Sequence, residues 1–204
     1  MMTLEQAKIL AAEGGYGRIP LSREIYSDIR TPMEVLRILK QVSRHCYLLE
    51  SVEESKRWGR YTFLGFDPVL ELTCTDGNLR IKGGTVVEQK ADHPGDAIRK
   101  ILAENKSPRL DGLPAFTGGL VGYFSYDYLK YAEPSIKLGD ADEDSFQDVD
   151  LMLFDRVIVF DHYKQKLILI AGVDAADPER SYAEAAEKLD ETERLLYSSA
   201  KAAF

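Results

Sequence analysis

The sequence contains few of the residues from which metal sites and disulfide frameworks are built. Among its 204 residues there are two cysteines, Cys46 and Cys74, and three histidines. The histidines, His45, His93 and His162, lie far apart, and no Cys-x-x-Cys or His-x-x-x-His spacing occurs, so no zinc site is expected. Each cysteine lies in an apolar run that predicts a strand. Reduced core thiols are therefore favoured over a disulfide, and a cytoplasmic location is favoured with them.

Positive charge and long apolar segments are also lacking. The chain has 26 Lys and Arg against 34 Asp and Glu, a formal net charge of −8. Binding to phosphate backbones or anionic membranes needs a clustered basic excess, so nucleic acid is not an expected partner. No apolar stretch approaches the ~20 residues of a membrane span, and the first residues lack a basic segment followed by an apolar one. Secretion and membrane insertion are both disfavoured.

The residues that are present predict helices and strands in one domain. Helix-start and helix-stop signals predict four helices, at about 2–13, 31–42, 93–102 and 178–198. The apolar face of the second is expected at Val35, Ile38, Leu39 and Val42. Period-two and apolar runs predict extended segments at 16–25, 46–51, 61–65, 69–75, 116–127, 151–160 and 166–170.

The connections between the predicted strands indicate the fold class. Asp76-Gly77 and Gly83-Gly84 are expected to be hairpin turns that link three consecutive strands into a meander. A last hairpin is expected from 151–160 and 166–170, with a turn at 161–165, and the acidic segment 139–150 is expected to be a solvated, mobile loop. Strands outnumber helices and are joined mostly by hairpins. We therefore predict an α+β fold with a large, mainly antiparallel sheet and packed helices, forming one domain over residues 1–204.

The glycine-rich segment 116–127 invites comparison with a phosphate-binding loop. It lacks both the Gly-Lys-Ser/Thr ending and the Gly-x-Gly-x-x-Gly spacing. We predict a buried strand instead, in which Gly118, Gly119 and Gly122 leave room for close backbone approach. No Gly-x-Ser-x-Gly elbow marks a serine nucleophile, so hydrolase chemistry is not indicated.

The end of the strand at 46–51 is the most suggestive place for a site. There Glu50 and Ser51 follow an apolar run, and Arg57 and Arg60 follow within a short loop. An acidic side chain, a hydroxyl and basic side chains therefore lie close together in the sequence. The alternative interpretation is that Glu50 and Ser51 close the strand and cap the loop while the arginines are solvated.

Leu48-Leu49-Glu50-Ser51, followed by Trp58-Gly59-Arg60-Tyr61-Thr62-Phe63-Leu64-Gly65, resembles the segment with which the anthranilate synthase component I family holds its feedback inhibitor, tryptophan. Three further segments, at 28–32, 116–127 and 155–162, support the resemblance. It implies the amino-terminal regulatory domain of an enzyme of tryptophan biosynthesis, which converts chorismate and ammonia to anthranilate and pyruvate.

The resemblance also implies what this chain does not carry. In the family, chorismate and Mg²⁺ are bound mainly by a carboxy-terminal half, and a glutamine amidotransferase subunit delivers ammonia. Nothing in the sequence resembles that half. We therefore expect no catalytic residue and no cofactor in these residues, no turnover of chorismate by this chain alone, and weak tryptophan binding at most.

Four tryptophan-binding residues are implied by the resemblance: Leu49, Glu50, Ser51 and Arg60. Free tryptophan is a zwitterion with an apolar indole, so it needs an anionic, a cationic and an apolar partner. Glu50 is expected to face the ammonium or indole N–H, Ser51 to offer its hydroxyl or backbone N–H, and Arg60 to favour the carboxylate. Lys56 or Arg57 is an alternative to Arg60.

Other functions share parts of this pattern. Aminodeoxychorismate synthase component I and the isochorismate synthases have the same architecture, and the Leu-Glu-Ser motif does not separate the former from the anthranilate enzyme. The remaining alternatives are a free-standing amino-acid-binding module that regulates a partner, and a structural subunit that docks a partner through its sheet.

Overall fold

The computed structural model describes residues 1–50, 59–133, 135 and 146–198. These residues form two five-stranded antiparallel sheets with five α-helices, which confirms the α+β prediction. Contacts divide the chain into two compact units. Unit 1 comprises Met1–Pro68, Glu104–Gly118 and Phe154–Phe204, and unit 2 comprises Val69–Ala103 and Gly119–Leu153. The expectation that residues 1–204 are the amino-terminal domain of a longer enzyme stays a prediction.

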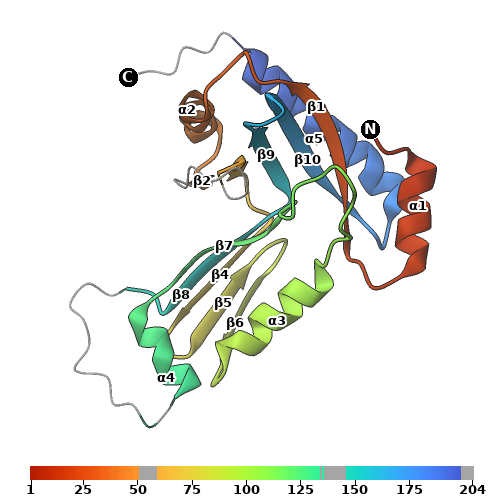
Figure 1. The fold of residues 1–204 in the computed structure, drawn as a ribbon. Helices are drawn as coiled ribbons and strands as arrows, with labels where there is room; N and C mark the ends of the chain where they lie inside the picture. The colour runs from red at the N-terminus through yellow and green to blue at the C-terminus, as the bar shows by residue number, and fades with distance from the viewer. Residues whose placement is uncertain (51–58, 134, 136–145, 199–204) are drawn as a thin grey trace. The chain divides into compact units, whose positions relative to one another are not determined.

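Unit 1 is built on a sheet with the strand order β1-β10-β9-β3-β2. Its strands are β1 (Arg18–Tyr26), β2 (Cys46–Glu50), β3 (Tyr61–Phe66), β9 (Arg156–Asp161) and β10 (Lys166–Asp174). The helices α1 (Leu4–Glu13), α2 (Pro32–Val42) and α5 (Pro178–Tyr197) pack on one face of this sheet (Figure 1). The core between them contains Leu21, Leu39 and Leu189, which are almost completely buried. A second apolar cluster, which includes Phe63, Val159 and Phe116, covers the opposite face.

The predicted helix starts are confirmed because their signals are local. Thr3 and Gln6 form a capping box at α1, and Thr31 and Glu34 form another at α2. Asp177 caps α5 by accepting a hydrogen bond from the backbone N–H of Arg180. One detail was wrong, since Val42, in the last turn of α2, is exposed. The buried stripe of α2 consists of Val35, Ile38 and Leu39.

Unit 2 is built on a second sheet, with the order β6-β5-β4-β8-β7. Its strands are β4 (Leu70–Thr75), β5 (Asn78–Lys82), β6 (Val86–Lys90), β7 (Gly119–Phe124) and β8 (Val149–Phe154). Residues of α3 (Pro94–Glu104), of the 3-10 turn η1 (Tyr126–Tyr128) and of α4 (Leu129–Ala132) pack with its core. The meander prediction is confirmed by β4, β5 and β6. Asp76 and Gly77 turn the first hairpin with φ of 49° and 73°.

The strand predicted at 151–160 is two strands. Residues 149–154 form β8 in the sheet of unit 2, and residues 156–161 form β9 in the sheet of unit 1, with Asp155 between them. The predicted hairpin therefore pairs β9 alone with β10, across the predicted turn. The sequence marks this division only by the charged pair Asp155-Arg156 between two apolar runs, because no glycine or proline separates them.

Two further expectations for unit 2 were wrong. The strand predicted at 116–127 is not buried, because β7 spans only Gly119–Phe124, lies at the edge of its sheet and exposes its last residues. In the acidic segment, residues 139–145 lie outside the described residues, but Asp148 is buried and 149–150 already belong to β8. No described helix is long and apolar enough to cross a membrane.

Candidate functional site

Three polar side chains meet where β2 ends in unit 1. The strand register places Glu50 opposite Thr62, and Thr62 opposite Phe160 of β9. The Thr62 hydroxyl lies 2.8 Å from Nε2 of His162 and donates a long hydrogen bond of 3.5 Å to Oε1 of Glu50. Thr62 is 1% exposed, whereas Glu50 and His162 are exposed. When the Thr62 proton points to Glu50, His162 must supply the proton for the other contact, since a hydroxyl has a single proton.

Leu49 does not join this group on the same face. Successive side chains of a strand point to opposite faces of a sheet. Leu48 packs with the helices, and Leu49, opposite Phe63, points to the other side and is 48% exposed. Because β2 is the edge strand, a ligand lying along its free edge can still reach side chains of both faces.

Arg60 is held by a buried aspartate. Its Nε and Nη2 donate to the two carboxylate oxygens of Asp161 at 3.0 and 2.6 Å, and the Asp161 side chain is 1% exposed. The backbone N–H groups of Tyr163 and Lys164 donate to the same carboxylate. Burial alone would raise the pKa of Asp161, but these hydrogen bonds and the Arg60 charge hold it below its usual value. Among the described residues, no hydrogen bond from Nη1 of Arg60 is seen, so this nitrogen is the one considered for a ligand.

The structure thus places three of the four predicted ligand residues. The Glu50 side chain lies beside Thr62, whereas the Arg60 guanidinium lies against Tyr61 and Asp161. Tyr61 packs with Phe63, on the face of the sheet to which Leu49 points. Ser51 lies outside the described residues, as do the alternatives Lys56 and Arg57. Whether these residues bind tryptophan stays a prediction.

Sequence reasoning missed Thr62, Asp161 and His162 as members of the site. All three lie inside the segments 58–65 and 155–162 that carry the family resemblance, but their neighbourhood depends on strand pairing. Glu50 and Thr62 are 12 residues apart, and Arg60 and Asp161 are 101 apart. Only the register of β2, β3 and β9 brings them together.

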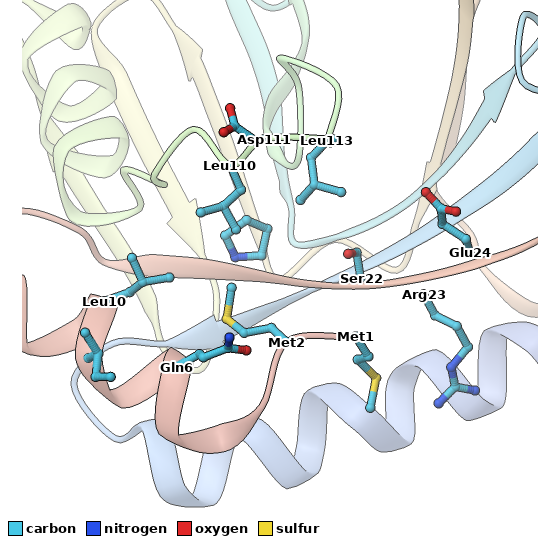
Figure 2. Close-up of a pocket in the computed structure, with 13 residues that line it drawn as sticks. Met1, Met2, Gln6, Leu10, Ser22, Arg23, Glu24, Leu110, Asp111 and Leu113 are labelled. Atoms are coloured by element: carbon cyan, nitrogen blue, oxygen red, sulfur yellow. The ribbon is translucent and has the colours of Figure 1, made fainter.

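A larger cavity in unit 1 lies away from these residues. It has a volume of about 800 Å³ and runs along β1, between residues of α1 and the segment 110–113 (Figure 2). Its lining contains three charged residues, Arg23, Glu24 and Asp111. Arg23 forms ion pairs with Asp190 and Glu193, and Glu24 forms one with Lys166. The rest of the lining is mostly apolar, and none of the residues predicted from the sequence to bind tryptophan lies in it.

Unit 2 contains a buried polar cluster around Asp148 that the sequence did not predict. The carboxylate accepts hydrogen bonds from Nζ of Lys130 at 2.8 Å, the hydroxyl of Tyr131 at 2.6 Å and the backbone N–H of Asp76 at 2.7 Å. The Tyr131 hydroxyl accepts in turn from the N–H of Gly77. Burial would raise the pKa of Asp148, but these donors hold it below its usual value. The cluster ties α4 to the first hairpin and is structural.

No three His, Cys, Asp or Glu side chains come close enough to hold a metal ion in the part of the chain that the structure describes. The described side chains at the end of β2 offer hydrogen bonds and charge. The exposed carboxylate of Glu50 ends β2, and the guanidinium of Arg60, which is partly committed to Asp161, immediately precedes β3. Such a pair suits a small zwitterion.

Comparison with known proteins points in one direction. The chorismate binding enzyme family matches residues 13–203. Anthranilate synthase component 1 of Acinetobacter calcoaceticus is 38% identical over 188 residues, covering 89% of this chain and 37% of that protein. The same enzyme of Pseudomonas aeruginosa is 36% identical over 198 residues, covering 95% of this chain and 40% of that protein. The crystal structure of anthranilate synthase component I from Streptococcus pneumoniae matches 87% of this chain and 37% of its own, with a TM-score of 0.56 and 28% identity. This chain thus spans well under half the length of these relatives.

Proposed function

This chain belongs to the family of chorismate binding enzymes, and we propose that it is the amino-terminal part of an anthranilate synthase component I. The complete enzyme would convert chorismate and ammonia to anthranilate and pyruvate in tryptophan biosynthesis. The observation that carries this proposal is the similarity to enzymes of that name over about nine-tenths of the chain. The alternative with the same architecture is aminodeoxychorismate synthase component I.

The chemistry itself would belong to the rest of the polypeptide. Chorismate and Mg²⁺ would bind there, and a glutamine amidotransferase subunit would supply ammonia. This chain alone would be inactive. Assaying the intact enzyme for anthranilate against aminodeoxychorismate tests the choice of product, and formation of aminodeoxychorismate would contradict it.

The regulatory role would lie at the end of β2, where tryptophan would bind as feedback inhibitor. The exposed Glu50 carboxylate would pair with the ammonium group, and Nη1 of Arg60 with the carboxylate, since Nε and Nη2 are already bound to Asp161. Leu49 would touch the indole at the free edge of β2. Inhibition further requires that tryptophan bind one conformation of the complete enzyme more tightly than another, because equal binding shifts no equilibrium.

Glu50→Gln in the intact enzyme tests this role. A hydrogen bond to a charged group contributes about 1.5–3 kcal/mol, so the tryptophan concentration for half-inhibition should rise roughly tenfold or more. The rate without tryptophan should stay within about twofold, because a contact made only to the inhibitor leaves catalysis unchanged. Glu88→Gln, on the exposed strand β6, is the control and should change neither quantity. Unchanged inhibition in the Glu50 variant would overturn the assignment.

The free-standing module makes a different prediction. A free-standing module needs a complete tryptophan pocket within these 204 residues. If the rest of the polypeptide completes the pocket instead, this chain alone should bind tryptophan weakly. Calorimetric titration of the 204-residue chain with tryptophan separates the two. A micromolar Kd would favour the module.

A further inference from the structure

The sequence contains two Asp-Gly pairs, Asp76-Gly77 in unit 2 and Asp111-Gly112 in unit 1. An aspartate before a glycine isomerises readily, because glycine has no side chain to hinder attack by its backbone nitrogen on the aspartate carboxyl group. Both aspartates are exposed. Exposure alone therefore does not distinguish the two sites, whereas their hydrogen bonds do.

Isomerisation of an aspartate needs freedom at two atoms. The glycine nitrogen forms a bond with Cγ of the aspartate and loses its proton, and a Cγ–O bond breaks with release of water. The product is a cyclic succinimide. Water then breaks the bond between that nitrogen and the main-chain carbonyl carbon of the aspartate, which leaves the chain linked through Cγ as isoaspartate. The water lost in the first step is regained in the second, so no co-reactant is needed.

The pair Asp76-Gly77 is held at both of these atoms. The N–H of Gly77 donates to the Tyr131 hydroxyl at 2.7 Å, and Oδ1 of Asp76 accepts from Nζ of Lys130 at 2.7 Å. The N–H of Asp76 also donates to the carboxylate of Asp148 at 2.7 Å. The attacking nitrogen and the carboxyl group would each have to leave a partner, and the turn between β4 and β5 would have to open.

The pair Asp111-Gly112 is held at neither atom. Residues 110–113 form a turn in which the N–H of Leu113 donates to the carbonyl of Leu110 at 3.2 Å. Gly112 is exposed and has a φ of 88°. Among the described residues, no hydrogen bond from the N–H of Gly112 or to the carboxylate of Asp111 is seen. Figure 2 shows Leu110 and Leu113 directed toward β1 and the Asp111 carboxylate directed away from it. The nitrogen and the carboxyl group can therefore approach each other without breaking a contact of their own.

We propose that Asp111 is the site at which this protein isomerises spontaneously to isoaspartate, and that the polar cluster around Asp148 protects Asp76. The proposal is independent of the proposed function. Isoaspartate adds one methylene group to the main chain, in the turn from which Leu113 packs against the second apolar cluster of unit 1. The modified residue is also a substrate for an isoaspartyl methyltransferase, which methylates the carboxylate that the rearrangement leaves outside the main chain.

The two sites can be compared within one chain. The 204-residue chain is incubated at neutral pH, and isoaspartate at each site is measured by peptide mapping and by methyl transfer from an isoaspartyl methyltransferase. We expect isoaspartate to form at Asp111 at least roughly tenfold faster than at Asp76, because reaction at Asp76 requires local opening of the turn. In urea, which unfolds the chain, the two rates should become equal. Asp111→Glu should abolish the reaction at this position, since attack on a glutamate would have to close a larger ring.

Tyr131→Phe tests the protection of Asp76. It removes the acceptor of the Gly77 N–H and should speed isoaspartate formation at Asp76 by roughly threefold or more, while the rate at Asp111 stays the same. Tyr163→Phe, at an exposed position in unit 1, is the control and should change neither rate.

Several outcomes would overturn the proposal. One is the absence of isoaspartate at Asp111, and another is a rate in the folded chain that is equal at both sites or higher at Asp76. A difference that persists in urea would also overturn it, because the difference would then follow from neighbouring residues in the sequence and not from hydrogen bonds. An unchanged rate at Asp76 in Tyr131→Phe would overturn the protective role of the cluster.

Discussion

Each compact unit contains a buried aspartate that forms an ion pair with a basic side chain. The carboxylate of Glu50 in unit 1 differs from both because it is exposed. Asp148 in unit 2 and Asp161 in unit 1 each accept at least three hydrogen bonds from neighbouring donors. Within the described residues, Glu50 has one long hydrogen bond, from Thr62. Carboxylates that are buried and fully paired hold strands and turns together, whereas an exposed carboxylate with a single weak contact retains the capacity to bind a ligand.

The largest expected effect comes from removing Asp148, because three donors lose their acceptor at once. Asp148→Ala leaves Tyr131 and the N–H of Asp76 without their acceptor, and Lys130 without its buried partner. Breaking such a buried arrangement should lower the free energy of unfolding by about 3 kcal/mol. Urea unfolding of the 204-residue chain, followed by circular dichroism, measures it. The control Asp96→Ala removes an exposed ion pair with Arg99 and should cost less than about 0.5 kcal/mol. If both variants lost the same free energy of unfolding, the buried Asp148 would contribute no more than an exposed ion pair.

Asp161→Asn should have the next largest effect, about 2 kcal/mol, measured in the same way. The asparagine oxygen still accepts from a backbone N–H, and Arg60 is partly exposed and can turn to water. Arg60→Lys should cost about as much, because an ammonium cannot form the bidentate pair. If the Lys variant were as stable as the parent, the pair would contribute no more than an ordinary surface contact.

Acid should weaken both clusters together. The folded pKa of Asp148 and that of Asp161 lie below the unfolded value, so their stabilisation is present above about pH 4 and is lost as pH falls through the folded pKa. The free energy of unfolding should therefore fall steadily from pH 5 to pH 3. In Asp148→Ala the fall should be shallower, because one of the two linked protonations is gone. An unchanged slope in that variant would contradict the link between Asp148 and acid stability.

Features whose interacting residues are close in the sequence could be predicted, and features whose residues are far apart in the sequence could not. The caps at Thr3, Thr31 and Asp177 were predictable because each cap and its partner are three residues apart. The division of the strands between two sheets was not, because periodicity identifies a strand without its neighbours. The same rule applies to the candidate site. Glu50 was found from a local motif, but its contact with Thr62 depends on the register of two strands.

The smallest predicted effect tests whether Thr62 orients Glu50 or merely lies beside it. Thr62→Val keeps the shape of the buried side chain and removes the hydroxyl, and His162 is exposed enough to bond water instead. The free energy of unfolding should fall by about 1 kcal/mol. The tryptophan concentration for half-inhibition of the intact enzyme should rise by roughly threefold, well below the Glu50→Gln effect, because the carboxylate remains and loses only its alignment.

Thr192→Val is the matched control for this last experiment. Thr192 is equally buried in α5, and its hydroxyl donates to the carbonyl of Lys188 in the same helix at 2.7 Å. Its stability should change by a similar amount while inhibition stays the same. If both threonine variants left inhibition unchanged while Glu50→Gln weakened it, Glu50 would bind tryptophan without help from Thr62. If both threonine variants weakened inhibition equally, the effect would follow from lost stability. The Glu50→Gln result alone would then support the distinction between buried, paired acids and an acid that binds a ligand.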